Sequence, residues 1–190
     1  LAPDAVVLVA TVKALKLHGG VAESDLSKHD LPAIERGLCN LERHVANVQK
    51  FGVPAIVCVN KFAGDSEEEL THLLALCKAK GIDAITADVW AKGADGALDL
   101  ADLVMAQTAK PNKFAPLYKL DAPIKEKLAT VASTIYGAAS VEYSNEALKE
   151  LKWLDKNGYG NLPVCVAKTQ YSFSDDPSLL GAPSGFKLNI

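Results

Sequence analysis

The stretch Pro54-Ala-Ile-Val-Cys-Val-Asn-Lys-Phe-Ala-Gly-Asp65 decides how this chain is expected to fold. It begins as an apolar run, Ala55–Val59, whose β-branched residues are typical of a strand covered on both faces. Beyond Gly64, Ser66 and Glu69 stand three residues apart, which is the spacing of a capping box at the start of a helix. Because ligands of open α/β sheets bind outside the carboxyl ends of the strands, we expect a ligand site where this strand ends.

Strands and helices alternate on both sides of this stretch. Apolar runs predict further buried strands at 4–10, 84–87 and 162–167, and residues 186–190 are also strand-like. Helical periodicity and stop signals predict helices at 32–50, 66–80, 97–109, 121–136 and 145–156, with Asp30, Asp121 and Ser144 or Asn145 as candidate caps. This alternation predicts an α/β fold with a mostly parallel sheet flanked by helices and joined by right-handed crossovers.

Composition excludes several classes of protein. The 190 residues carry a net charge of −3 with both signs interspersed, which argues against a nucleic-acid-binding arm. No apolar run approaches the roughly 18 residues that a membrane span needs. Four cysteines without a Cys-x-x-Cys motif (Cys39, Cys58, Cys77 and Cys165) are interpreted as free, buried thiols of a reducing, cytoplasmic compartment. No pattern predicts a metal site.

The residues that follow the predicted parallel strands should gather on one rim of the sheet. They offer cations and backbone N–H groups for an anion, and aromatic faces for a flat ligand. A packing role for the aromatic residues, a turn role for the histidine and a solvated role for single lysines remain open alternatives. The candidates are Lys13, Lys16, His18, Gly19, Gly20, Asn60, Lys61, Phe62, Trp90, Lys92, Lys168, Thr169, Tyr171 and Ser172.

Common catalytic motifs are absent from the chain. It contains no Gly-x-x-x-x-Gly-Lys-[Ser/Thr] loop, no Gly-x-Gly-x-x-Gly and no Gly-x-Ser-x-Gly. Asn60-Lys61 is similar to the Asn-Lys-x-Asp that reads guanine in GTPases, but Ala63 stands at the fourth position. These patterns alone support an α/β domain with a ligand rim and no complete catalytic machinery.

Six segments, in order, resemble the formate–tetrahydrofolate ligase family. They are Val9-Ala-Thr-Val-Lys-Ala-Leu-Lys-Leu-His-Gly-Gly20, Asn40-Leu-Glu-Arg-His44, Gly52-Val-Pro54, Val59-Asn-Lys-Phe62, Val89-Trp-Ala-Lys-Gly93 and Lys168-Thr-Gln-Tyr-Ser-Phe-Ser-Asp-Asp176. The resemblance implies a P-loop-NTPase-like ligase fold, ATP-dependent conversion of formate to formyl phosphate, and attack by N10 of tetrahydrofolate. It also implies that Phe62 and Trp90 hold the pterin ring between them. Lys13 departs from the family's usual Arg, and Ala63 from its frequent Pro.

The resemblance further implies that the chain is one incomplete α/β segment of a larger synthetase. Residues 1–118 would supply strand–helix repeats with the folate platform, and residues 119–190 a helical pair, a strand and a C-terminal loop. The family's phosphate-binding loop lies upstream of the matched segment, so we expect this chain alone to be inactive. The implied parent uses ATP with Mg²⁺, tetrahydrofolate and a monovalent cation, and is a cytoplasmic homo-oligomer. A GTPase-like module and a non-catalytic assembly fragment are the rival interpretations.

Overall fold

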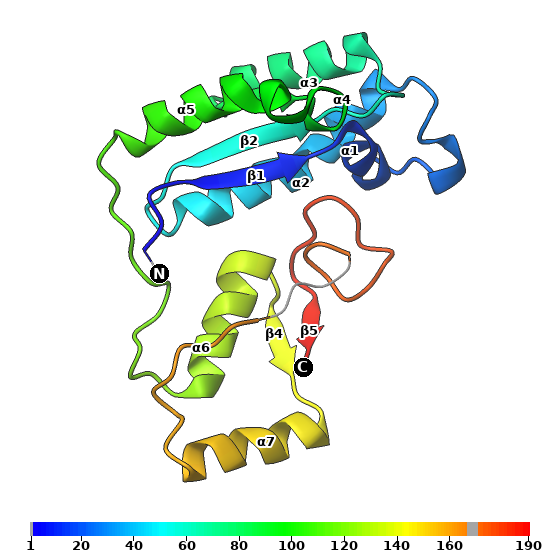
Figure 1. Cartoon of the computed structure of the whole chain (residues 1–190). Coiled ribbons are helices and arrows are strands. Elements are labelled where there is room, and N and C mark those ends of the chain that lie inside the picture. The colour runs from blue at the N-terminus through cyan, green and yellow to red at the C-terminus, as the bar shows by residue number, and fades with distance from the viewer. Residues whose placement is uncertain (1, 167–170) are drawn as a thin grey trace. The chain divides into compact units, whose positions relative to one another are not determined.

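The computed structural model describes residues 2–166 and 171–190, which form two compact units, Leu1–Ala115 and Pro116–Ile190. The first unit is built on a three-stranded sheet of order β1-β2-β3. Its strands are β1 (Val6–Ala10), β2 (Ala55–Asn60) and β3 (Ala84–Ala87). Figure 1 labels the first two of these strands, which lie side by side. Both pairs are parallel, with Ala10 opposite Val59 and Asn60 opposite Ala87. The predicted α/β class and parallel sheet are therefore confirmed.

The helices predicted at 32–50, 66–80 and 97–109 are present, each within one residue of its predicted ends, and two short helices follow β1 and β3. Asp30 caps α2 as expected, because its Oδ1 accepts the Ala33 N–H at 2.9 Å. The helices are α1 (Val12–His18), α2 (Leu31–Gln49), α3 (Glu67–Ala79), the short α4 (Val89–Lys92) and α5 (Leu98–Thr108), with 3₁₀ turns at Glu23–Asp25 and Gly93–Ala97. No helix in the described part of the chain is long and apolar enough to cross a membrane.

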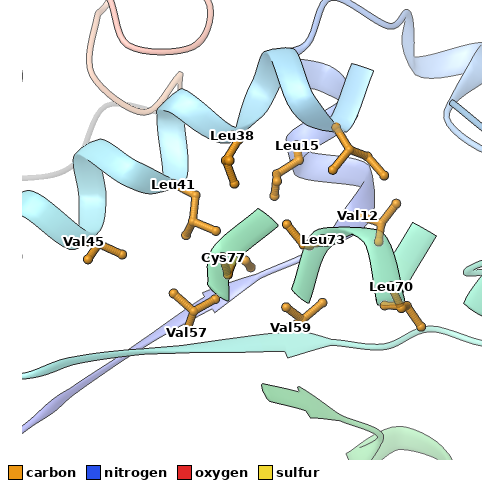
Figure 2. Close-up of a cluster of buried hydrophobic side chains, with 12 residues drawn as sticks. Val12, Leu15, Leu38, Leu41, Val45, Val57, Val59, Leu70, Leu73 and Cys77 are labelled. Carbon is orange, nitrogen blue, oxygen red and sulfur yellow. The ribbon is translucent and has the colours of Figure 1, made fainter. Parts of the chain in front are cut away.

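The main core lies between one face of the sheet and α1, α2 and α3. Figure 2 shows the side chains of these helices converging on the strands beneath them. The cluster comprises Ala10, Val12, Leu15, Ile34, Leu38, Leu41, Val45, Val57, Val59, Leu70, Leu73 and Cys77. This apolar layer fixes α1 and α3 over the strands, and so places the segments that follow each strand.

The opposite face of the sheet is covered unevenly. Side chains alternate along a strand, so Val7 and Val9 of β1 share this face with Ile56 and Cys58 of β2. Ile56 and Cys58 are buried, whereas Val7 is 38% exposed and Val9 is 68% exposed. The prediction that the first strand is buried is therefore wrong for this face.

The capping box expected at Ser66 and Glu69 does not form. Ser66 is the N-cap of α3, but its side chain makes no capping hydrogen bond. Glu69 is buried instead, and its Oε1 contacts Lys16 Nζ at 2.5 Å. The helix begins where predicted but without the capping box, because the glutamate of the predicted box is paired with a lysine from α1.

The described residues of the second unit form two α-helices and a small sheet. The helix α6 (Ile124–Val131) continues into a π-helical turn, Ala132–Tyr136, which ends at Gly137 with φ +76°. The strand β4 (Ser140–Glu142) precedes α7 (Asn145–Lys156), and β5 (Lys187–Asn189) lies at the C-terminal end of the chain. The two strands pair in parallel. The Ser144 hydroxyl caps α7, as expected, whereas α6 starts after Pro123, so Asp121 is not its cap.

The buried strand predicted at 162–167 is wrong for residues 162–166, and Ala167 lies outside the described residues. This segment runs without regular structure, and Cys165 is exposed rather than buried. Side chains hold it in place: the Tyr118 hydroxyl donates to the Val164 carbonyl at 3.0 Å and accepts its N–H at 2.9 Å. Fully buried Lys127 donates to the carbonyls of Gly160 and Leu162. An apolar run becomes a strand only when a neighbouring strand is available to pair with it.

Candidate functional site

The three parallel strands end at the same edge of the first unit, as the sequence predicts. β1 leads into α1 through Thr11, whose hydroxyl accepts the Ala14 N–H at 3.0 Å. Beyond β2, the Lys61 N–H donates to the Ala87 carbonyl at 2.9 Å and so continues the pairing with β3. The residues just beyond β2 and β3 are therefore neighbours, and they carry Phe62 and Trp90, respectively.

A tight turn presents the Phe62 ring. The Phe62 N–H donates to Asp65 Oδ2 at 2.9 Å, and the Asp65 N–H donates back to the Phe62 carbonyl at 3.0 Å. The ring is 38% exposed, and Lys13 Nζ lies 5.8 Å from its centroid, within the range of a cation–π contact. Phe62 is thus a partly exposed aromatic surface, held by its own backbone and approached by an ammonium group.

The Trp90 indole is far more exposed than Phe62. It lies on α4 and is 78% exposed. The loop that carries it is closed by the Asp88 N–H, which donates to the Gly96 carbonyl at 3.0 Å. A Cβ at Gly96 would lie 2.2 Å from the Asp88 carbonyl oxygen, so only glycine permits this approach. An exposed indole on a closed loop is available to stack on a flat ligand.

The lysines of the rim are in three different situations. Lys13 and Lys92 are exposed, with Lys92 Nζ 3.9 Å from Asp88 Oδ2. Lys61 bonds to Glu67, and this hydrogen bond raises the pKa of its ammonium group above the usual value. Lys16 is 2% exposed and bound to Glu69, so it is not placed on the rim as the sequence suggested.

The other predicted rim groups also differ from expectation. The N–H groups of Gly19 and Gly20 donate to the carbonyls of Leu15 and Leu17, so they close α1 rather than face an anion. His18 and Asn60 are half-buried. A Cβ at Gly19 would lie 2.0 Å from the Ala33 carbonyl oxygen, which gives this glycine a packing role.

The remaining candidates belong to the second unit or lie outside the described residues. Lys168 and Thr169 are among the residues that the structure does not describe. Tyr171 is 39% exposed, and Ser172, which follows it, is buried with φ +78°. Positive φ is uncommon for a residue other than glycine and costs conformational energy.

Three features of this edge escaped the sequence analysis. Asp65 holds the Phe62 turn, Gly96 closes the Trp90 loop, and Glu69 neutralises Lys16. Asp65 could have been found, because Gly and Asp are both frequent in turns and Gly64-Asp65 follows the predicted strand. The pairing of Lys16 with Glu69 has no local signal, since 53 positions separate the two residues in the chain.

The described residues contain no group of three or more His, Cys, Asp or Glu side chains that could hold a metal ion. The four cysteines are free, with Cys58 and Cys77 buried and Cys39 half-buried. The edge therefore combines two exposed aromatic rings, two exposed ammonium groups and nearby carboxylates that are largely paired. Such a set can stack on a flat heterocycle and attract its anionic substituents, and it contains no nucleophile–base pair.

Comparison with known proteins identifies the family. The family model described as formate–tetrahydrofolate ligase matches residues 1–190. This chain belongs to that family. It is 52% identical over 190 residues to the formate–tetrahydrofolate ligase of Renibacterium salmoninarum, and 48% identical over 189 residues to that of Lactiplantibacillus plantarum. The ligase of Latilactobacillus sakei is 47% identical over 188 residues.

Each alignment covers 99–100% of this chain but 34% of the relative, so the chain spans about a third of the length of the curated relatives it matches. The predicted resemblance is confirmed over the whole segment, and the family match excludes the GTPase-like interpretation. Phe62 and Trp90, the two aromatic residues that the resemblance singled out, both lie just beyond strand ends at this edge of the first unit.

Proposed function

We propose that this segment supplies the folate platform of an ATP-dependent formate–tetrahydrofolate ligase. The observation that carries the proposal is the placement of Phe62 and Trp90 just beyond the ends of two paired parallel strands, both partly or largely exposed. Stacking of a nucleobase on an aromatic side chain contributes about 1–3 kcal/mol. A pterin ring is a flat heterocycle of comparable size and would gain a similar amount from each ring.

The reaction that the platform serves has two steps. Formate takes the γ-phosphoryl group of ATP to give formyl phosphate and ADP. The N10 amine of tetrahydrofolate then attacks the formyl carbon, phosphate leaves, and the amine proton is lost to give 10-formyltetrahydrofolate. The contribution of this segment is positioning, since holding the pterin fixed brings N10 to the formyl group at a high effective concentration.

The charged groups of the edge suit the rest of the folate molecule. Lys13 is an exposed ammonium group beside the Phe62 ring, and exposed Lys92 follows Trp90 by two residues on α4. The glutamate tail of tetrahydrofolate carries carboxylates that such groups attract. Lys61 is hydrogen-bonded to Glu67, so its ammonium group is less available to a carboxylate of the substrate. Asn60, His18, Lys168, Thr169 and Tyr171 stay candidates for the wider substrate rim.

Phosphoryl transfer requires groups that this segment does not contain. The chain has no phosphate-binding loop to cradle the phosphates of ATP. Phosphoryl transfer from ATP with Mg²⁺ is therefore assigned to a full-length ligase, which also uses a monovalent cation, and this chain alone should show no ligase turnover. We further propose that the full-length protein is a cytoplasmic homo-oligomer that acts on small molecules.

The proposal is tested by steady-state kinetics of a full-length ligase that contains this segment. Phe62→Ala and Trp90→Ala should each raise the KM for tetrahydrofolate about 10- to 100-fold, the equivalent of roughly 1–3 kcal/mol. The KM for ATP should change less than twofold. The matched control is Trp153→Ala, which removes the exposed indole of α7. Unchanged KM for tetrahydrofolate in both Phe62→Ala and Trp90→Ala would reject the platform.

A further inference from the structure

A buried ion pair joins α1 and α3, the helices that follow β1 and β2. Lys16 of α1 is 2% exposed, and its Nζ lies 2.5 Å from Glu69 Oε1, 2.8 Å from the Lys28 carbonyl and 3.1 Å from the Leu26 carbonyl. A lysine ammonium has three N–H donors, so each has an acceptor here. Neither charge is free to bind a substrate.

Glu69 makes a second connection. Its Oε1 also accepts the N–H of Asp30, the N-cap of α2, at 2.9 Å. One pair of side chains therefore ties together α1, residues 26–30 before α2, and the first turn of α3. Long-range ties of this kind set the distance between elements, which local hydrogen bonds within a helix cannot do.

The elements joined by this pair are those that carry the Phe62 platform. Lys13 precedes Lys16 by one turn of α1 and lies against the Phe62 ring. Phe62 leads into α3 through the turn closed by Asp65, and Lys61 bonds to Glu67 in the same first turn that holds Glu69. A shift of α1 relative to α3 would therefore move Lys13 relative to Phe62.

Packing alone does not require this pair. Val12 and Leu15 of α1 already pack with Leu70 and Leu73 of α3 in the apolar cluster (Figure 2). A buried ion pair adds little net stability over apolar residues of similar size, because the desolvation of both charges offsets their attraction. Its contribution is to select one arrangement of the elements that it joins.

We propose that Lys16 and Glu69 are positioning residues for folate binding, which hold Lys13 against Phe62 by locking α1 to the start of α3. This inference rests on the proposed function, because it takes Phe62 as part of the folate platform. Neither residue touches substrate. Their effect passes through the relative position of Lys13 and Phe62.

The test uses a full-length ligase that contains this segment, with Lys16→Met, Glu69→Gln and the double variant. The double variant removes both charges together, so no uncompensated charge is left buried. The matched control is Lys80→Met, which breaks the exposed ion pair between Lys80 of the α3 C-cap and Glu42 of α2 at 2.7 Å. Circular dichroism establishes which variants are folded, and kinetics are measured for all three substrates.

We expect the KM for tetrahydrofolate to rise at least fivefold in Lys16→Met and in the double variant. The KM for ATP and formate should change less than twofold, and Lys80→Met should leave all three constants within twofold. A folded double variant with an unchanged KM for tetrahydrofolate would overturn the proposal. So would a similar rise in every KM, or a failure of all three variants to fold, because either result assigns the pair to general stability.

Phe62→Ala distinguishes a failure of the positioning role from a failure of the folate platform. If it raises the KM for tetrahydrofolate while the double variant does not, the platform stands and the positioning role is overturned. If Phe62→Ala has no effect, the platform itself fails and the positioning role fails with it.

Discussion

At the scale of single residues, the thiol of Cys77 shows how strongly the core of the first unit excludes water. Cys77 lies on α3, is 0% exposed and packs within the main apolar cluster. Burial raises the pKa of the Cys77 thiol from 9.0 to about 11, with a smaller contribution from the Glu42 carboxylate. The thiol therefore stays neutral in the folded chain at pH values where an unfolded chain loses the proton.

This shift makes stability depend on pH. Unfolding releases the Cys77 proton between about pH 9 and pH 11, so the free energy of unfolding falls as pH rises through this window. The full contribution is on the order of 2 kcal/mol. The free energy of unfolding, measured with urea, should fall more between pH 7.5 and pH 10.5 in the wild type than in Cys77→Ala. Equal losses in the two proteins would contradict the burial of this thiol.

At the scale of elements, the contact between α1 and α2 depends on two glycines. A Cβ at Gly37 of α2 would lie 1.9 Å from the Leu15 carbonyl oxygen, and one at Gly19 would meet the Ala33 carbonyl in the same way. The two helix backbones can approach this closely only because both residues lack a side chain. This crossing holds α1, and with it Lys13 and Lys16, beside the edge of the sheet.

Gly37→Ala should force the two helices apart. Overpacking of this kind costs about 1–3 kcal/mol, or a fall in Tm of roughly 2–12 °C for a chain of this size. Gly64→Ala is the matched control, because a Cβ at Gly64 would meet nothing within 4 Å and its φ is not positive. Thermal unfolding followed by circular dichroism measures both. A Gly37→Ala variant as stable as Gly64→Ala would show that α1 and α2 are not packed this closely.

The elements also show what the sequence could predict. Periodicity and cap residues were sufficient for α2 and α7, whose N-caps Asp30 and Ser144 act as predicted, and for β2, which is covered on both faces. They failed where tertiary partners decide the outcome. Residues 162–166 have the composition of a strand without a neighbour to pair with, and Glu69 has the spacing of a capping box but pairs with Lys16. Phe62 and Trp90 were found because they follow the ends of predicted parallel strands, and their joint role comes from the family resemblance.

At the scale of the whole molecule, the first unit exposes an incomplete sheet face. Within the described residues β1 pairs only with β2, and Val7 and Val9 are exposed beside that edge. Parallel strands are usually covered on both faces, and an uncharged edge strand can pair with another chain. The curated relatives are about three times longer than this chain, which leaves ample polypeptide to cover this face in a full-length ligase.

This face predicts that the 190-residue chain associates with itself in solution. Light scattering coupled to size exclusion should give an apparent mass that rises with concentration. Val9→Lys should reduce the association, because a charge on an edge strand opposes pairing with another chain. Ala75→Lys, on the exposed surface of α3, is the matched control and should leave the association unchanged. A monomer at every concentration would contradict self-association through the exposed edge of β1.

A fluorescence titration tests whether Phe62 and Trp90 form a tetrahydrofolate platform. The chain has two tryptophans, so in a Trp153→Phe background the tryptophan emission comes from Trp90 alone. We predict saturable quenching of Trp90 by tetrahydrofolate, with affinity falling about 10- to 100-fold when Phe62→Ala is added. Emission that stays constant through the titration, in a chain shown to be folded by circular dichroism, would contradict the platform.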